Sequence, residues 1–310
     1  MTDWIERAAL KGRQFLISRQ SEGGFWTDWQ LPPGESTIWT TAYVGYRLAP
    51  FDSETASTAL KRAAFWLRAH EFAEGGWGYR EELGPDADST ALAILFLSSV
   101  GFSAPDRCFE RLLAFQRADG GFATFLPPGA FGAWTAAHPE VTATAVSALL
   151  TRFGAGERCV ARGVEWLLEN TAPDGLWHSY WWDSRLYSIE ASLAVVRRAD
   201  EAIDADRALR ALRAIAARNC FEQSLRIMSS AHLGHADEAG VSALVAAQDP
   251  DGGWPSSALL RLTDRACEDP WNREQAGPLF LDGNRIFTTA TALAALAAAR
   301  RRTAHTGEDR

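Results

Sequence analysis

The sequence is poor in cysteine and has no long apolar run. Its four cysteines are widely separated and form no CxxC pair, a pattern that predicts buried thiols in a reducing cytoplasm rather than a disulfide framework. The longest apolar run, residues 292–299, is far too short to cross a bilayer, which takes about 20 residues. Residues 1–4 are polar and acidic, so we expect no secretory signal. These features predict a cytoplasmic protein without a transmembrane segment and leave peripheral membrane contact open.

Lysine is also scarce. Lys11 and Lys61 are the only lysines, arginine carries the rest of the positive charge, and the formal net charge is −8. An acidic protein has no electrostatic attraction to nucleic acid or to an anionic membrane surface, so nucleic acid is not an expected partner.

Apolar and aromatic residues are abundant instead. Hydrophobic residues make up 47% of the 310 residues and charged residues 23%, which suits a large core in one barrel or repeat fold. The thirteen Trp and sixteen Phe residues are expected to fill that core, line a cavity, or do both.

One pattern recurs five times: a helix, a Gly-rich turn often preceded by Gln, and an aromatic residue. Glycine permits the left-handed backbone after a helix, Gln can bond to the turn, and the aromatic ring can pack on the next hairpin. The motif therefore indicates a clasp between helices and argues for a fold rather than for chemistry. Its copies end at Trp26, Trp77, Phe122, Trp177 and Trp254.

Two sets of helices alternate along the chain. One set is apolar on every side, which predicts burial on every side, at residues 36–48, 88–100, 140–153, 184–198, 221–233 and 284–301. The other is amphipathic, at residues 3–19, 56–70, 107–116, 162–169, 204–218 and 238–248. We therefore predict an all-α fold in one domain over residues 1–302, an (α/α)6 double ring of six hairpins. We also expect a lid at residues 255–283 and a disordered tail at residues 303–310.

The repeated motif resembles the QW repeat of the squalene–hopene and oxidosqualene cyclases, a family of class II terpene cyclases. Residues 75–91, which run from Gly-Gly-Trp to Asp-Ala-Asp-Ser-Thr-Ala, resemble the acid motif of that family. The likeness extends over roughly residues 5–300, which corresponds to the catalytic barrel alone. It implies an isomerase, an intramolecular cyclase with a hydrophobic isoprenoid as its small-molecule substrate; the sequence gives no oligomeric state.

The resemblance assigns the proton donor. A class II cyclase needs a neutral carboxylic acid, and two close carboxyls help one of them to stay protonated. By the motif, Asp88 is the donor, Asp86 is its partner, and Ser89 replaces the family's third acid. The same residues would also cap an apolar helix, and both roles are compatible.

Two further positions belong to the expected catalytic set. Glu140 matches an acid of the family and is expected to orient Asp88, take the final proton or pair with a buried Arg. Thr144 stands where bacterial members have an activating His, and the nearest His, His138, is expected to be a loop residue. The weakened acid site suggests an epoxide or otherwise activated substrate, which matched alkene and epoxide substrates would test.

Aromatic faces stabilise a migrating cation by roughly 0.5–2 kcal/mol each. Glu190, an acid within an apolar helix, is expected either to act in the site or to form a structural ion pair. The candidates for substrate or cation binding, of which about half are expected to face the cavity, are Trp39, Phe125, Trp134, Trp177, Tyr180, Trp181, Trp182, Tyr187, Glu190, Trp271 and Phe287.

No metal cofactor is implied, and Mg²⁺ would enter only with a diphosphate substrate. Such a head group would need clustered arginines, for which Arg80, Arg185, Arg226 and Arg285 are candidates. A prenyltransferase-like barrel would need zinc, and Asp264, Cys267 and His305 make a poor set for it. Two alternatives stay open: an altered barrel that only binds a hydrophobic ligand, and an acid-catalysed cyclase of a non-terpenoid substrate.

Overall fold

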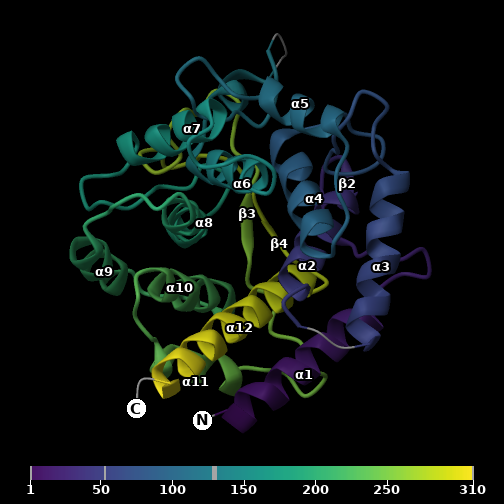
Figure 1. Ribbon diagram of the computed structural model, residues 1–310, viewed down its shortest axis with the longest axis vertical. Coiled ribbons are helices and arrows are strands. Elements are labelled where there is room, and N and C mark those ends of the chain that lie inside the picture. Colours follow the sequence, from purple (N-terminus) through teal and green to yellow (C-terminus); the bar gives the residue numbers. More distant parts are fainter. Residues whose placement is uncertain (1, 52–53, 128–130, 309–310) are drawn as a thin grey trace.

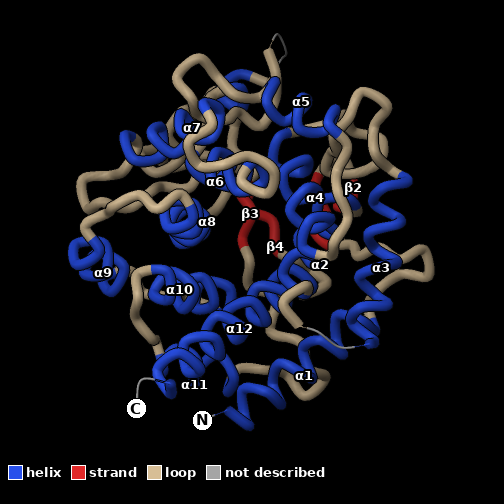
Figure 2. The backbone as a smooth tube through the Cα atoms, viewed as in Figure 1, coloured by secondary structure: helices blue, strands red, loops and turns tan. Residues whose placement is uncertain are grey.

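The computed structural model describes residues 2–51, 54–127 and 131–308, and over these its regular secondary structure is mostly helix, joined by long loops (Figures 1 and 2). The even-numbered helices are α2 (Ile38–Leu48), α4 (Ala87–Ser99), α6 (Pro139–Leu149), α8 (Arg185–Arg198), α10 (Cys220–His232) and α12 (Ile286–Glu308). The odd-numbered helices are α1 (Thr2–Ser18), α3 (Glu54–Ala69), α5 (Asp106–Ala114), α7 (Arg158–Glu169), α9 (Ala205–Ala214) and α11 (Glu238–Ala246). All but α12 lie within a few residues of their predicted ranges.

The even-numbered helices form a closed inner ring. Each packs against the next, from α2 through α4, α6, α8 and α10 to α12, and α12 packs back against α2. These helices are rich in small residues because their neighbours approach closely on both sides. At Gly45 in α2, for example, an added Cβ would lie 2.5 Å from the Phe96 ring of α4. The odd-numbered helices lie outside this ring (Figure 1) and are amphipathic, as the pattern predicts.

The clasp motifs tie neighbouring outer helices together. The Gln20 amide donates to Gly24 O in its own turn and to Ala59 O of α3, at 2.8 Å each. The Trp26 indole N–H donates to Leu16 O at 2.7 Å. The left-handed glycine is required here because a Cβ at Gly24 would lie 3.0 Å from the Arg62 carbonyl oxygen. The same indole bond recurs from Trp77 to Leu67, from Trp177 to Leu167 and from Trp254 to Leu244.

The last clasp connects the two ends of the chain. The Gln248 amide donates to Gly252 O and, at 2.9 Å, to Ala8 O of α1. The fourth clasp is looser than the others: Thr171 stands at the Gln position and bonds only to Leu168 O. Among the five joints that carry a clasp, the one between α7 and α9 is therefore the loosest, and no clasp motif joins α9 to α11.

Long loops gather at the N-terminal ends of the inner helices. The predicted lid, residues 255–283, contains β3 (Leu259–Arg261) and β4 (Leu279–Leu281), which pair antiparallel. It is bound to other loops by Arg261 N, which donates to Trp181 O at 2.6 Å. A second hairpin, β1 (Asp28–Leu31) with β2 (Gly34–Ser36), lies beside β4, and a 3-10 turn, η1, covers Gly132–Thr135.

The last inner helix is longer than expected. α12 continues to Glu308, through most of the stretch for which the sequence predicts a disordered tail, and Asp309 and Arg310 lie outside the described residues. No helix in the described part of the chain is long and apolar enough to cross a membrane.

Candidate active site

The predicted acid motif lies where α4 begins, at the loop-covered end of the inner ring. Asp86 is the N-cap: its carboxylate accepts hydrogen bonds from Ser89 N and Ser89 Oγ, both at 2.8 Å. Burial raises the Asp86 pKa to about 6, against the opposing effect of the Ser89 bonds. Both Asp86 oxygens are thus occupied by donors from the helix, so Asp86 is the member of the acid pair that is held as an anion.

Asp88, in the first turn of α4, has one bound and one unbound carboxyl oxygen. The Trp39 indole N–H of α2 donates to Oδ2 at 2.6 Å, whereas Oδ1 is buried and has no hydrogen-bond partner. Burial and, secondarily, the Asp86 charge raise the Asp88 pKa to about 7, and the Trp39 bond lowers it. Asp88 is therefore largely protonated below neutral pH, with its proton placed on Oδ1 because Oδ2 accepts the indole N–H.

Glu140 and Thr144 lie close to Asp88 but are engaged elsewhere. Glu140, buried at the start of α6, accepts from Tyr180 N and Trp181 N at 2.7 Å each and from Ser188 Oγ at 2.9 Å. It thereby anchors residues 180–181 and raises the pKa of Asp88 through its charge. The Thr144 hydroxyl donates to Glu140 O at 2.8 Å and lies close enough to Asp88 to oppose the rise in the Asp88 pKa.

His138 does not act on the acid. Its ring stacks on Tyr180, with centroids 3.6 Å apart, and its Nε2 lies 3.1 Å from Ala133 O. Burial lowers its pKa to about 3, which keeps the ring neutral. The side chain that donates to the acid is therefore Trp39 rather than His138.

A cluster of stacked rings surrounds Trp39. Trp39 stacks on Phe287 at the start of α12, with centroids 4.9 Å apart, and Phe287 stacks on Tyr43 at 3.7 Å. Trp182 stacks on Tyr187 at 4.2 Å and on Phe287 at 5.4 Å. We call Trp29, Trp39, Tyr43, Trp182, Tyr187, Phe221 and Phe287 the ring-end cluster. Four of its members, Trp39, Trp182, Tyr187 and Phe287, are predicted cation-binding residues, and the inner helices bring them together at the acid.

A second aromatic group lies in the covering loops. Trp134 donates its indole N–H to Thr263 O at 2.7 Å, Trp181 to Thr124 Oγ1 at 2.9 Å, and Trp271 to Ser179 O. Phe125 lies 5.8 Å from the Trp134 ring, and the Arg265 guanidinium lies 4.9 Å from it on the other side. The predicted residues Phe125, Trp134, Trp181 and Trp271 thus join the loops that cover the site.

Two predicted binding residues lie away from the acid. Trp177 is fully buried and bonds to Leu167 O, so it is a clasp aromatic, equivalent to Trp26. Glu190, one turn below Tyr187, forms a buried ion pair with Arg47 at 3.0 Å and lies 3.4 Å from His232 Nε2. The Arg47 charge and His232 overcome the burial of Glu190 and lower its pKa to about 2, which makes it a structural anion and a poor base.

Several site residues carry little local sequence signal. Trp29 and Phe221 complete the ring-end cluster, with Trp29 centred 5.6 Å from Trp182 and Phe221 centred 5.2 Å from it. Asp28, next to Trp29, bonds to the free N–H groups of Ile286 and Phe287 and so caps α12 from a distant hairpin. The one local feature that marks any of these residues is the Trp-Thr-Asp-Trp sequence at residues 26–29.

The candidate arginines for a diphosphate are paired with carboxylates. Arg185 forms two bonds to Asp174 at 2.8 and 2.9 Å, and Arg226, Arg285 and Arg80 pair with Asp237, Asp249 and Glu82. Among the described residues no three His, Cys, Asp or Glu side chains gather as a metal site. His305 lies in the part of α12 whose side chains are not described.

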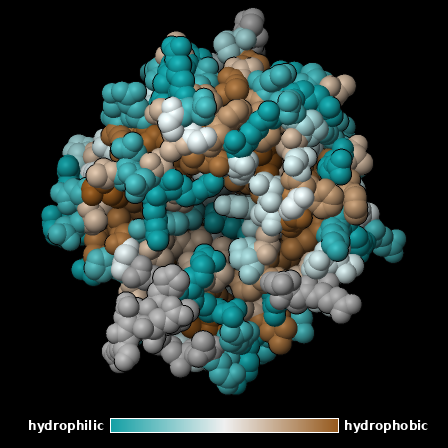
Figure 3. All heavy atoms as spheres, viewed as in Figure 1, coloured by the Kyte–Doolittle hydropathy of each residue, from teal (hydrophilic) through white to brown (hydrophobic). Residues whose placement is uncertain are grey.

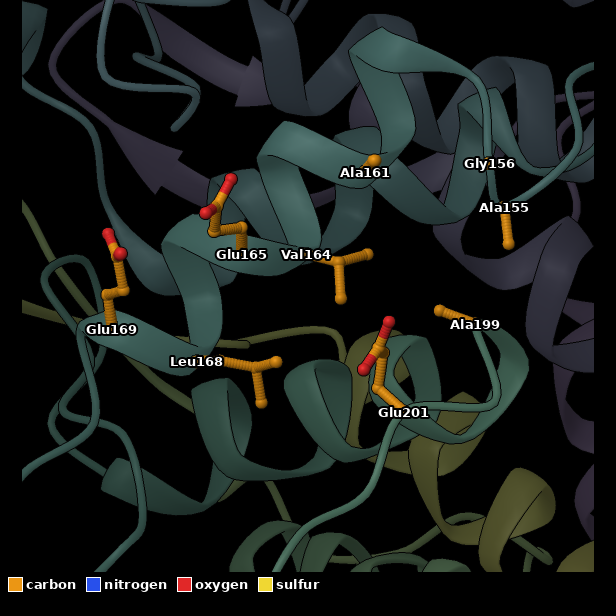
Figure 4. A pocket seen from close by; sticks show the side chains of 9 residues that line it. All are labelled: Ala155, Gly156, Ala161, Val164, Glu165, Leu168, Glu169, Ala199 and Glu201. Atoms are coloured by element: carbon orange, nitrogen blue, oxygen red, sulfur yellow. The ribbon is translucent and has the colours of Figure 1, made fainter.

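Hollows occur at two places. Figure 3 shows one face hollowed at its centre, above the ring, with hydrophilic residues around the hollow. A separate cavity of about 680 Å³ lies outside the ring, between α7 and the segment after α8. Apolar residues such as Val164 and Leu168 and the acids Glu165, Glu169 and Glu201 surround it (Figure 4). It contains none of the predicted site residues and lies at the loose joint between outer helices.

No family model matches the sequence. Among curated proteins, the chain is similar to a squalene–hopene cyclase from Schizosaccharomyces japonicus, 27% identical over 193 residues, which cover 49% of this chain and 29% of the relative. It is also similar to a drimenyl diphosphate synthase from Streptomyces showdoensis, 29% identical over 226 residues, which cover 70% of this chain and 36% of the relative. The chain thus spans about a third of the length of these relatives.

Solved structures match over nearly the whole chain. The type II terpene cyclase MstE from Scytonema matches with a TM-score of 0.86 at 24% identity, covering 97% of this chain and 99% of that one. A protein from Actinoplanes matches with a TM-score of 0.83 at 26% identity, covering 96% and 99%. By sequence over part of its length the chain is therefore similar to squalene–hopene cyclase and drimenyl diphosphate synthase, and by fold over nearly all of its length it is similar to a type II terpene cyclase.

Proposed function

We propose that this protein is a class II terpene or meroterpenoid cyclase, an isomerase that converts a linear isoprenoid chain to a cyclic isomer with Asp88 as the general acid. The observation that carries the proposal is the state of Asp88: a buried carboxyl with a raised pKa, one oxygen held by Trp39 and the other unbound. Weak bases such as alkenes are protonated only by a neutral, water-excluded acid.

The proton moves from Asp88 Oδ1 to the substrate. Proton transfer to the terminal double bond, or to an epoxide oxygen there, leaves a carbocation, and successive double bonds attack it to close rings. Loss of a proton from the last cation makes the product an isomer of the substrate. Asp86 and Glu140 act by holding negative charge near Asp88 and keeping it protonated before the reaction.

The ring-end cluster supplies the environment for the cation. Ring faces attract a cation without attacking it, each by about 0.5–2 kcal/mol. Trp39, Phe287, Trp182 and Tyr187 lie next to Asp88 in a connected stack, so a cation formed there meets aromatic faces at once. We assign these four residues to cation binding, and Phe125, Trp134, Trp181 and Trp271 to the cover that excludes water.

The architecture fits this proposal. We assign the closed ring of helix pairs to a single (α/α)6 barrel spanning residues 1–302, and the clasps to QW repeats. The drimenyl diphosphate synthase named above is one relative, and a variant of MstE has been solved with geranylgeranyl dihydroxybenzoate as its substrate. Because the candidate arginines here are paired with carboxylates, we favour an uncharged or aryl-linked head group over a diphosphate for this chain.

A substrate panel tests the proposal. The purified protein would be incubated with linear isoprenoids carrying free alcohol, diphosphate, epoxide and aryl ends, and products would be analysed by mass spectrometry. We expect a product with the same mass as its substrate and the same head group, in which rings replace some of the double bonds. Tight binding of the isoprenoid chains without turnover would favour an altered barrel that only binds hydrophobic ligands. Turnover of other polyenes but not of isoprenoids would favour a non-terpenoid substrate.

A further inference from the structure

Trp29 is an unusual residue within the ring-end cluster. Its backbone has a φ of 58°, in the left-handed region that side-chain-bearing residues rarely adopt. Its side chain is 1% exposed, and its indole N–H is buried with no acceptor. A strained backbone and an unpaired buried donor are both unfavourable, and they persist together where function requires them.

The surrounding structure holds Trp29 in this conformation. The backbone N–H of Trp29 donates to Asp28 Oδ1 at 3.0 Å, and Trp29 O accepts from the Tyr79 hydroxyl at 2.6 Å. The β1–β2 pairing is irregular between Asp28 and Gln30, so Trp29 does not follow the regular alternation of side chains between the two faces of the hairpin. The irregular pairing and these two hydrogen bonds together fix the position of the indole.

Trp29 lies beside the acid. Its ring centre is 6.1 Å from that of Trp39, and Trp39 bonds to Asp88 Oδ2. Each of the two residues that neighbour Trp39 in this way has a buried polar atom without a partner: Asp88 Oδ1, which carries the acidic proton, and Trp29 Nε1, which carries a hydrogen-bond donor. A carbon–carbon double bond would engage only the first of them. An oxygen atom has two lone pairs and would engage both.

We propose that Trp29 is a specificity-determining residue that binds an oxygen atom at the reacting end of the substrate, so that the substrate class is a terminally oxygenated isoprenoid such as an epoxide. This inference rests on the proposed function. The Asp88 Oδ1–H bond breaks and its proton goes to the epoxide oxygen. The epoxide C–O bond then breaks to give a hydroxyl and a tertiary carbocation, while Trp29 donates to the same oxygen.

The test compares one linear isoprenoid with its terminal epoxide, using wild type and Trp29→Phe, which keeps an aromatic ring and removes the N–H. We expect wild type to prefer the epoxide, and the epoxide-to-alkene ratio of kcat/KM to fall about tenfold in the variant, the effect of one buried hydrogen bond. The ratio does not depend on the folded fraction. Trp182→Phe, which alters the same stack, is the matched control and should change the ratio by less than about twofold.

Other results separate this inference from the proposed function. A wild-type preference for the alkene, or an unchanged ratio in Trp29→Phe, would overturn the inference and leave an acid-initiated cyclase standing. Absence of turnover of both substrates by wild type would overturn both. A ratio that falls equally in Trp182→Phe would show a general effect of the aromatic stack and would also overturn the role of Trp29.

Discussion

At the scale of single residues, the site depends on how two carboxyl groups in one turn differ. Asp86 receives two hydrogen bonds from Ser89, and Asp88 receives one from Trp39 and keeps a free oxygen. Burial raises the pKa of both, but only Asp88 has an oxygen available to a substrate. The helix cap and the acid are therefore adjacent residues with separate roles.

The pH dependence of activity should report Asp88. Since the protonated form reacts, kcat/KM should be flat at low pH and fall as pH rises through about 7. In Trp39→Phe the bond that favours the carboxylate is lost, so this fall should move to higher pH while the maximum rate decreases. Rates measured from pH 5 to 9 would check this, and a fall that stays in place or moves to lower pH would contradict the role of Trp39.

The same acid should cost stability. The Asp88 pKa is about 7 in the folded chain, whereas the ordinary pKa of an exposed aspartate is 3.8. Between these two pH values the folded state holds a proton that the unfolded state lacks. Its contribution to stability is therefore lost as pH rises from about 4 to 7. Asp88→Asn should be more stable than wild type at pH 8, by about 1–3 kcal/mol in urea unfolding, with the difference vanishing near pH 4. Equal free energies of unfolding for Asp88→Asn and wild type at pH 8 would show that the ionised Asp88 carboxylate does not destabilise the folded state.

At the scale of elements, two carboxylates cap the N-terminus of α12: Asp28, which is far away in sequence, and Asp282, which lies just before the helix. Asp28 accepts from Asn284, Ile286 and Phe287 N–H groups, and Asp282 accepts from Ser257, Ala258 and Thr288. The first of these carboxylates connects the β1 hairpin to the helix that carries Phe287. The position of Phe287 in the ring-end cluster therefore depends on Asp28.

Replacing Asp28 by Asn should loosen that connection. An amide has one acceptor oxygen, so at least two backbone N–H groups would lose their partner, and we expect a loss of about 2–3 kcal/mol in the free energy of unfolding. Activity should also fall because Phe287 is released. Asp106→Asn, which changes an exposed Asp paired with Arg152, is the control and should leave the free energy of unfolding nearly unchanged. Equal losses in the two variants would exclude a capping role.

Elements and motifs with local causes were predictable from the sequence. The helices follow from their apolar patterns, and the Asp86–Asp88 pair follows from a cap motif in front of an apolar helix. The sequence does not distinguish Trp177, which belongs to a clasp, from the tryptophans of the site, because both the clasps and the site use this residue type. Trp29 and Arg47 were missed because their importance comes from partners far along the chain, which no local pattern shows.

At the scale of the whole molecule, ring closure joins the ends of the chain. Gln248 bonds to Ala8 O, 240 residues away, and α12 packs on both α1 and α2. A closed ring exposes no terminal repeat that would need a cap. The site at one end of the ring is held in place by all six inner helices together.

Cutting the closing clasp should therefore loosen α1. In Gln248→Ala two hydrogen bonds to backbone carbonyls are lost, and we expect about 1–2 kcal/mol of destabilisation together with faster amide hydrogen exchange in α1. Gln116→Ala, which removes the same pair of bonds within the third clasp, should cost as much but leave exchange in α1 unchanged. Identical exchange in both variants would mean that Gln248 does not hold the ends together.

The measurement that tests the central claim most directly is the rate of cyclic isomer formation by wild type and by Asp88→Asn at pH 6, with folding of both checked by circular dichroism. Asparagine keeps the acceptor for Trp39 and cannot donate the proton, so we predict a folded variant whose rate is lower by at least about a thousandfold. A loss of this size lies within the roughly hundredfold to ten-thousandfold contribution of general acid catalysis, and no water can replace the acid in a dry site. A variant that retains more than about a tenth of the wild-type rate would contradict the assignment of Asp88 as the proton donor.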